Sequence, residues 1–178
     1  MITVNKVILR KKTLSDARDD YRWQKDAELA RLDAGAPRNI SYARFLAEYS
    51  FELYYPLGDR REFAIESPVG VHIGNCVYYN ISISRGEAEL GIIIGERDYW
   101  GKGYGTAAIN ALLEHVFTHT GINRVYLKTL DWNIRAQRCF AKCGFKPAGN
   151  LVKNGYNFVS MELYRHPWQT EQREQSRD

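Results

Sequence analysis

Residues 88–94 read AELGIII and residues 100–106 read WGKGYGT, and these two segments decide how the chain folds. Three consecutive isoleucines leave the first segment apolar on both faces, which is typical of a central strand covered on both sides. The second segment is rich in glycine and leads into residues 106–119, whose apolar side chains recur with helical spacing. The sequence therefore predicts a buried strand, a glycine loop and the start of a long helix in succession.

A loop of this kind is suited to hold a phosphate or a diphosphate. The first turn of a helix has unpaired N–H groups at the positive end of its dipole, and glycine lets the backbone approach a ligand closely. The Walker A pattern fails because no Gly-Lys-Ser/Thr ends a six-residue loop, and the third glycine of the dinucleotide fingerprint is replaced by Thr106. The loop alone leaves open an unrelated nucleotide site or a purely structural turn.

The segments on either side complete an α/β (α+β) pattern. From β-branched and aromatic residues, strands are predicted at 4–10, 62–66, 71–83, 88–95, 124–130, 145–148 and 156–164. Helices are predicted at 13–32, from Ser41 through Leu53, at 106–119 and at 133–142, the last closed by Gly144. This order predicts a mixed, mostly antiparallel sheet of about seven strands with about four helices on its two faces.

Composition indicates one ordinary globular domain. The chain has 178 residues, of which 44% are hydrophobic and 26% charged, and its net charge is +4. We expect a single domain over 1–168 and a polar tail at 169–178. The cations are scattered, which argues against nucleic-acid binding, and no apolar run approaches the roughly 20 residues of a membrane helix. Because residues 1–6 lack the layout of a secretory signal, we expect a cytoplasmic protein with no membrane partner.

Two pairs of metal-binding residue types have helical spacing. Cys139 and Cys143 are four residues apart, as are His115 and His119, and together they could imitate a zinc site. The dense Cys-x-x-Cys spacing is absent, and the histidines also suit the C-terminal end of their helix. We therefore expect reduced thiols and no metal.

Two motifs stand at the separation that is typical of a known family. Gly103 and Gly105 fit the loop pattern Arg/Gln-x-x-Gly-x-Gly/Ala, with Trp100 where Arg or Gln is common, and Asn133 followed by FAKCGF at 140–145 fits the second motif. On these residues the chain resembles the GNAT superfamily of acyl-CoA-dependent N-acetyltransferases. Within it, the chain is most similar to the ribosomal-protein alanine and spermidine acetyltransferase (RimJ/RimL-like) branch. The resemblance covers nearly the whole chain and implies the GNAT fold.

The resemblance also implies acetyl-CoA as cosubstrate and the residues that bind it. The pantetheine arm would pair with the backbone of Ile92, Ile93 and Ile94 like an added strand. Backbone amides would hold the diphosphate at Lys102, Gly103, Tyr104, Gly105 and Thr106. The side chain of Asn133 would bond the pantetheine amides, cap its helix, or do both. Phe140 would pack near the thioester, or would be an ordinary core aromatic.

The implied reaction moves the acetyl group from the thioester to a primary amine by direct attack in a ternary complex. Glu89, two residues before Gly91, matches the glutamate base of histone acetyltransferases in the same superfamily. It would take the proton of the amine directly or through water; the alternative is a surface strand glutamate paired with a cation. Many family members carry a tyrosine acid at the position of Phe140, so the sequence names no proton donor for the leaving thiolate.

The acceptor amine stays open between a protein N-terminus, a polyamine and another small amine. Carboxylates of the first two helices could attract a cationic amine or could be solvated helix faces: Asp26, Glu28, Asp33, Glu48 and Glu52. The pairs Tyr54-Tyr55 and Tyr78-Tyr79 could line a groove or belong to the core. The alternative to an enzyme is a non-catalytic acyl-CoA sensor with the same fold. Family likeness alone suggests a homodimer.

Overall fold

The structure, a computed structural model, describes residues 2–4 and 6–169. In this part of the chain, one eight-stranded sheet has the order β1-β2-β3-β4-β5-β6-β8-β7, and β5 and β6 are its single parallel pair. The strands are β1 (Ile2–Val4), β2 (Val7–Lys11), β3 (Arg61–Glu66), β4 (His72–Ser82), β5 (Glu87–Ile94), β6 (Arg124–Leu130), β7 (Lys146–Lys153) and β8 (Tyr156–Tyr164). The helices are η1 (Leu14–Asp16), α1 (Ala17–Lys25), α2 (Ala27–Leu32), α3 (Tyr42–Tyr54), η2 (Arg97–Tyr99), α4 (Tyr104–His119) and α5 (Ile134–Lys142). The predicted mixed, mostly antiparallel sheet is confirmed.

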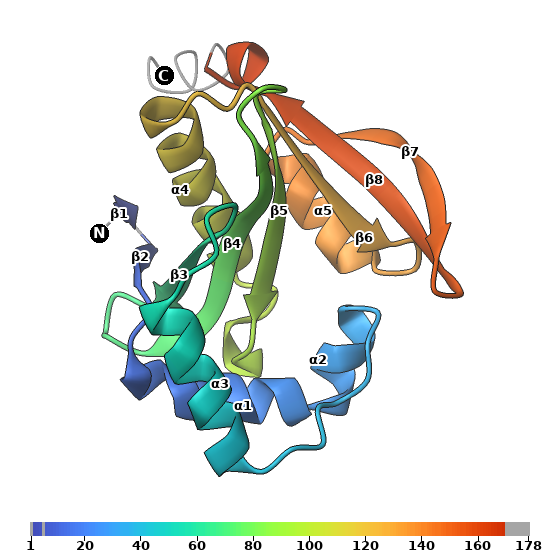
Figure 1. Cartoon of the computed structure of the whole chain (residues 1–178). Coiled ribbons are helices and arrows are strands. Elements are labelled where there is room, and N and C mark those ends of the chain that lie inside the picture. Colours follow the sequence, from blue (N-terminus) through green and yellow to red (C-terminus); the bar gives the residue numbers. More distant parts are fainter. Residues whose placement is uncertain (1, 5, 170–178) are drawn as a thin grey trace.

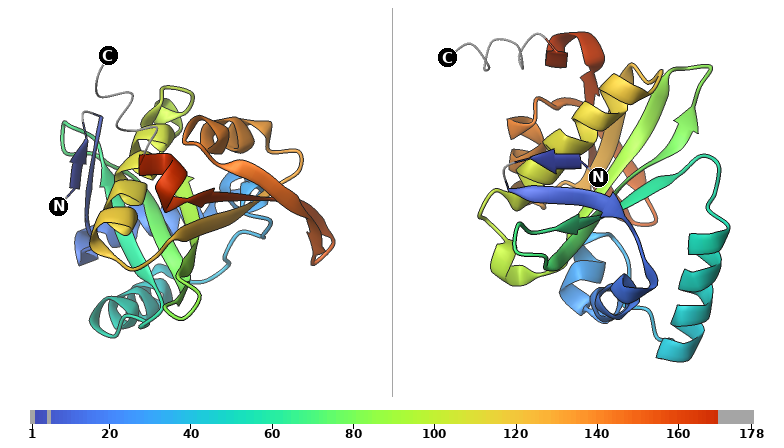
Figure 2. Two further views of the ribbon diagram at one scale, coloured as in Figure 1. Left: turned by 90° about the horizontal axis from the view of Figure 1, so that it is seen from above. Right: turned by 90° about the vertical axis from the view of Figure 1, so that its left-hand side faces the viewer.

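Helices cover both faces of the sheet, because neighbouring residues of each strand point to opposite sides. Along β4, Cys76 and Tyr78 belong to the buried cluster that contains α4, whereas Asn75 donates a hydrogen bond to Asp20 of α1. Figure 1 shows α1, α2 and α3 grouped at the end of the sheet where β5 ends. Seen from above (Figure 2, left), α3 and α5 lie on opposite sides of the strands.

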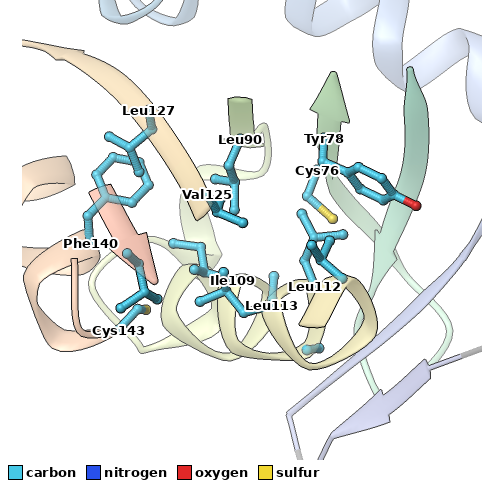
Figure 3. Close-up of a cluster of buried hydrophobic side chains, with 14 of the residues drawn as sticks. Cys76, Tyr78, Leu90, Ile109, Leu112, Leu113, Val125, Leu127, Phe140 and Cys143 are labelled. Atoms are coloured by element: carbon cyan, nitrogen blue, oxygen red, sulfur yellow. The ribbon is translucent and has the colours of Figure 1, made fainter. Parts of the chain in front are cut away.

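The main core lies between the sheet and the pair α4 and α5. Ile109, Leu112 and Leu113 of α4 are fully buried against Leu90 of β5 and Val125 of β6 (Figure 3). Burying each such side chain contributes roughly 1.5–3 kcal/mol. A smaller cluster of Ala17, Phe45 and Tyr49 joins α1 to α3. The apolar stripe that the sequence shows at 106–119 therefore fixes α4 against the central strands.

Two segments differ from the sequence prediction for local reasons. The helix predicted at 13–32 is broken at Asp26, whose carboxylate accepts hydrogen bonds from the N–H groups of Glu28 and Leu29 and so starts α2 as a new helix. Of the single strand predicted at 4–10, Val4 belongs to β1 and residues 7–10 belong to β2, and the antiparallel pair of β1 and β2 adds a strand to the expected seven.

The last hairpin is also longer than predicted. β7 continues to Lys153 instead of ending at residue 148, because Asn154 and Gly155 both adopt positive φ and turn the chain into β8. This Asn-Gly pair is the usual signal of a two-residue hairpin turn. The tail predicted at 169–178 lies outside the described residues except for Gln169, which belongs to a helical turn that includes residues 165–169.

The feature that positions the site is a split between β5 and β6. Their pairing ends at Glu89 and Tyr126. Beyond that point β5 continues to Ile94, while β6 continues to Leu130 paired with β8. Figure 1 shows the two strands diverging from this apex. The edge of β5 that faces β6 is thus open over its last residues. None of the helices in the described part of the chain is long and apolar enough to span a bilayer.

Candidate active site

A cavity of about 890 Å³ is lined from both faces of the sheet around the split. One end, called the loop end, is bordered by the C-terminal half of β5, by the glycine loop over residues 100–106 and by α5. The other end, called the helix end, is bordered by α1 and α2 together with β3 and β4. One cavity therefore brings together segments of very different sequence position.

The open edge of β5 presents backbone groups to the cavity. The N–H of Gly95 donates to the carbonyl of Ile73 in β4, and successive residues of a strand point their backbone groups to alternate sides. The backbone groups of Ile92 and Ile94 therefore face the split, and residues 92–94 all line the cavity. The backbone groups of Ile93 face β4 instead. The indole of Trp100 donates to the Ile94 carbonyl at 2.6 Å, which leaves the N–H of Ile94 and the backbone groups of Ile92 for a ligand.

The glycine loop ends at a helix start without a side-chain cap. Gly103 is the N-cap of α4 and has a φ of 86°, a conformation that favours glycine. Because no side chain caps this end, the first-turn N–H groups of Tyr104, Gly105 and Thr106 are available to an anion. A Cβ at Gly105 would lie 3.4 Å from the sulfur of Cys139, so glycine allows α4 and α5 to approach closely here.

Two of the residues predicted in this loop do not line the cavity with their side chains. The carbonyl of Lys102 accepts a hydrogen bond from Lys6 at 3.0 Å, and the ring of Tyr104 packs edge-on against Tyr99. The roles predicted for Lys102 and Tyr104 concern backbone amides and stay predictions.

Asn133 and Phe140 both border the cavity from α5. The Asn133 side-chain oxygen accepts from the N–H of Ala136 and so caps α5, and this leaves its NH₂ group to donate toward a ligand. Phe140 is 6% exposed and packs against Phe145 and the core cluster beside Leu127 (Figure 3). Phe140 is thus a core aromatic that also forms part of the cavity wall, and its packing near the thioester stays a prediction.

The loop end is also basic, a property that we did not predict. Arg135, Arg138 and Lys142 line the cavity from α5, and the Arg135 guanidinium lies 3.7 Å from the ring centre of Trp100. Their spacing of three and four residues puts them on one helix face, a signal that was present in the sequence. Together with the α4 N-terminus, these cations make the loop end suitable for a ligand with several phosphate groups.

Cys139 lines the loop end as well. Its sulfur lies 3.4 Å from the hydroxyl of Thr106. A hydrogen bond from Cys143 lowers the pKa of the Cys139 thiol against the effect of burial, and Thr106 and the nearby cations of α5 lower it further. Within residues 2–4 and 6–169, no group of three or more histidine, cysteine or acidic side chains is arranged to hold a metal ion.

Glu89 is placed differently from the other predicted residues. It is buried at the apex of the split and does not line the cavity. Its carboxylate accepts from Lys128 at 2.9 and 3.1 Å and from Asn80 at 3.0 Å. The cation pairing considered from the sequence is therefore present, but at a buried position rather than on the surface. The role of Glu89 as a base stays a prediction.

Charged groups at the helix end are mostly paired with one another. Lys12 forms ion pairs with Asp20 and Glu62, and Arg60 contacts Glu62 at 3.5 Å. Asp33, at the end of α2, has no ion-pair partner in the part of the chain that the structure describes. Asp33 is solvent-exposed and borders the cavity, and the protein groups around it desolvate its carboxyl in part and so raise its pKa. The helix end thus has one carboxylate left for a cation.

Of the five carboxylates singled out in the sequence, Asp33 alone borders the cavity. Asp26 and Glu28 pair with Arg97, and Glu48 pairs with Arg38 and Arg44. Among the four tyrosines, Tyr79 lines the cavity, Tyr78 is part of the core, and Tyr54 and Tyr55 are exposed.

A split sheet edge that leads to an uncapped helix start defines a site for a long ligand with phosphate groups. Residues 6–146 match the model of the acetyltransferase (GNAT) domain family, and the chain belongs to this family. It is therefore an N-acetyltransferase with acetyl-CoA as its cosubstrate, which confirms the family, the class of enzyme and the cosubstrate that the motifs predict.

Curated relatives and a solved structure agree with this assignment. The chain is 27% identical to an uncharacterized N-acetyltransferase p20 of Bacillus licheniformis over 147 residues, which cover 82% of each chain. It is 28% identical to a spermidine N(1)-acetyltransferase of Vibrio cholerae over 139 residues, 70% of this chain and 80% of the relative. The crystal structure of the V. cholerae spermidine N-acetyltransferase with CoA and spermine has a TM-score of 0.83, 22% identity and coverage of 93% and 99%. The shared fold is thereby shown.

Proposed function

We propose that the chain acetylates a primary amine of a small polycation, a polyamine-like molecule, by direct attack on acetyl-CoA in a ternary complex. One observation carries this proposal: a single cavity has a basic end and an end with an unpaired carboxylate, joined through the split between β5 and β6. Such a cavity can hold both substrates at once, with their reacting groups meeting at the split. Attack within that complex needs no acetyl-enzyme intermediate.

The loop end supplies what CoA needs along its length. Backbone groups of Ile92 and the N–H of Ile94 would pair with the pantetheine arm, and the NH₂ group of Asn133 would bond one of its amides. The first-turn amides of α4 would hold the diphosphate, with Arg138 and Lys142 nearby to neutralise phosphate charge. With the diphosphate at α4 and the pantetheine arm along β5, the acetyl group would lie toward the apex of the split. Phe140 contributes to the cavity wall. Backbone N–H groups at the split would stabilise the oxyanion.

The helix end favours an acceptor that carries positive charge beyond the reacting amine. Asp20 and Glu62 are neutralised by Lys12 and Arg60, so the carboxylate of Asp33 is the group left to receive an ammonium. The spermidine and spermine acetyltransferases among the relatives act on acceptors of this class. A polyamine has a second cationic nitrogen that would pair with Asp33 while its terminal amine points toward the split.

The test is release of free CoA thiol with a panel of amines: spermidine, spermine, Ala- and Ser-starting peptides, an aminoglycoside and an amino sugar. We expect the polyamines to give the highest kcat/KM. Asp33→Asn should raise the polyamine KM about fivefold with kcat nearly unchanged, since one partly screened charge pair is worth about 1 kcal/mol. Glu52→Gln, a matched change on α3 outside the cavity, should leave KM as it is.

Two results would contradict the proposal. Peptides acetylated faster than polyamines would remove the acceptor class while keeping the cosubstrate. No thiol release with any amine, together with tight binding of acetyl-CoA, would favour the non-catalytic sensor instead.

A further inference from the structure

Tyr79 lies between the buried Glu89 and the cavity. The two residues are directly opposite each other in the register of β4 and β5, so their side chains share one face of the sheet. The ring of Tyr79 covers Gly91, because a Cβ at that glycine would lie 3.6 Å from the Cε1 atom of Tyr79. Tyr79 and Gly91 both line the cavity, whereas Glu89 does not. On this face, Tyr79 therefore places a hydroxyl-bearing side chain that borders the cavity directly beside Glu89.

The direction of the hydrogen bonds is fixed by the chemistry of the groups. The Glu89 carboxylate accepts from Lys128 and Asn80, and an ionised carboxylate has no proton to donate. In a hydrogen bond between Glu89 and the neighbouring Tyr79 hydroxyl, the phenol is therefore the donor. Burial first, and then the charge and hydrogen bond of Glu89, raise the pKa of Tyr79, so the phenol keeps its proton. With its proton donated to Glu89, the phenol oxygen keeps a lone pair that can accept from a group in the cavity.

The position of this pair coincides with the apex of the split. Pairing of β5 with β6 ends at Glu89, and the open edge starts just after it. A pantetheine arm that runs from the α4 N-terminus along residues 94–92 would end near Gly91, which the Tyr79 ring covers. The phenol oxygen is therefore close to the place where the attacking amine would meet the thioester.

We propose that Tyr79 is a catalytic residue that relays the proton of the attacking amine to the buried carboxylate of Glu89. This inference rests on the proposed function. As the nitrogen bonds to the thioester carbon, an N–H bond breaks and a bond from that proton to the Tyr79 oxygen forms. The original phenol proton moves to Glu89, so Tyr79 ends neutral and Glu89 protonated. The C–S bond breaks, CoA leaves as the thiolate, and the amide remains.

Within this relay Glu89 acts on the substrate through Tyr79, and Lys128 and Asn80 hold its carboxylate in place. The relay explains how Glu89 can act as the predicted base although its side chain does not line the cavity. It does not require the tyrosine that Phe140 replaces, since that residue would serve the leaving thiolate rather than the amine.

The experiment compares Tyr79→Phe with Tyr126→Phe, using the amine that the wild-type enzyme acetylates best. Tyr126 also lies near Glu89 but does not line the cavity, so it is a matched control. Tyr79→Phe keeps the ring over Gly91 and removes the relay oxygen. We expect its kcat to fall about 100-fold with the KM for acetyl-CoA unchanged, whereas Tyr126→Phe stays within about twofold. Thermal unfolding of both variants checks that each is folded.

A double-mutant cycle with Glu89→Gln provides the second measurement. If the two residues act as one relay, the variant that carries both changes loses no more activity than Tyr79→Phe alone. Additive losses, or a normal kcat for Tyr79→Phe beside an impaired Glu89→Gln, would overturn the relay while leaving the acetyltransferase function intact. If the wild type turned over none of the amines, the proposed function would fail and the relay with it.

Discussion

The two ends of the cavity are built in different ways. The loop end comes from contiguous sequence, residues 91–106, with α5 added, and it offers mainly backbone groups and cations. The helix end is assembled from α1, α2, β3 and β4, and it offers side chains that are already paired across long sequence separations. A backbone-built site can be recognised from a short motif. A site made of paired side chains depends on which partners the fold brings together.

This difference predicts that substitutions at the two ends affect separate properties. At the helix end, removing a buried partner should cost folding stability. At the loop end, changes should reduce affinity for the cofactor and leave folding nearly intact.

The largest effect on folding stability is expected for Asp16→Asn, in η1 directly before α1 of the helix end. The Asp16 carboxylate is 2% exposed and accepts two hydrogen bonds from Arg10, at 2.7 and 2.8 Å, and one from the N–H of Thr13. Removing one partner of a buried ion pair costs roughly 3–5 kcal/mol, so we expect a loss of that size in the free energy of unfolding. Urea denaturation measures it, and Glu48→Gln in an exposed ion pair is the control with little change.

The same pair predicts a dependence on pH. Burial opposes ionisation of Asp16, but the hydrogen bonds from Arg10 and Thr13 outweigh it and lower the pKa of this carboxyl below its ordinary value of 3.8. Its stabilising contribution is therefore fully present above pH 3.8 and is lost as the pH falls through the lowered folded-state value. The stability gap between wild type and Asp16→Asn should narrow at the acid end. A gap that stays constant down to strongly acid pH would contradict the ion-pair argument.

The next effect is expected at the loop end, for Gly103→Val. A β-branched residue at a φ of 86° is strained by about 1–3 kcal/mol and turns the first-turn amides of α4 away from their positions. We expect the Kd for acetyl-CoA to rise about 100-fold, as measured by calorimetry, while the variant still folds. Gly58→Val is the control, because nothing lies within 4 Å of a Cβ there. A folded Gly103→Val protein with normal affinity would show that this loop does not hold the cofactor.

The smallest effect is expected for Arg138→Glu, which reverses one cation of the loop end. A rim charge is worth about 1 kcal/mol or less, so the Kd for acetyl-CoA should rise about fivefold in dilute buffer. The loss should shrink at high ionic strength, because salt screens exposed charges. Arg44→Glu, the same charge change on α3 outside the cavity, should leave affinity unchanged. Equal effects of the two variants would mean that only net charge matters.

Much of the loop end was accessible from the sequence. The isoleucine triplet, the glycine loop and the cap at Asn133 all express local preferences of the backbone, and each lies where the pattern predicts. The break at Asp26 was missed because an apolar helical pattern continues on both sides of it, while its capping hydrogen bonds form only within that turn. The long β7 was missed because the Asn-Gly signal at 154–155 was overlooked.

At the site, residues of the same type have different surroundings, and the sequence does not tell them apart. Asp33 and Asp26 read alike as acidic helix residues, yet Arg97 pairs with Asp26 and no cation pairs with Asp33 within the described residues. Likewise, Tyr78 and Tyr79 are neighbours in sequence, but strand alternation sends one into the core and the other to the cavity. Such differences arise from partners far away along the chain.

By itself, the sequence determined the family, the mixed sheet and the loop that is suited to a diphosphate. These features depend on hydrogen bonds and backbone conformations within short, contiguous segments of the chain. Only the tertiary structure decided that β5 and β6 part at Glu89, that Lys128 pairs with this glutamate, and that Tyr79 stands between it and the cavity. These outcomes depend on the register of strands distant in sequence. Register is set by packing over the whole sheet rather than by any one segment.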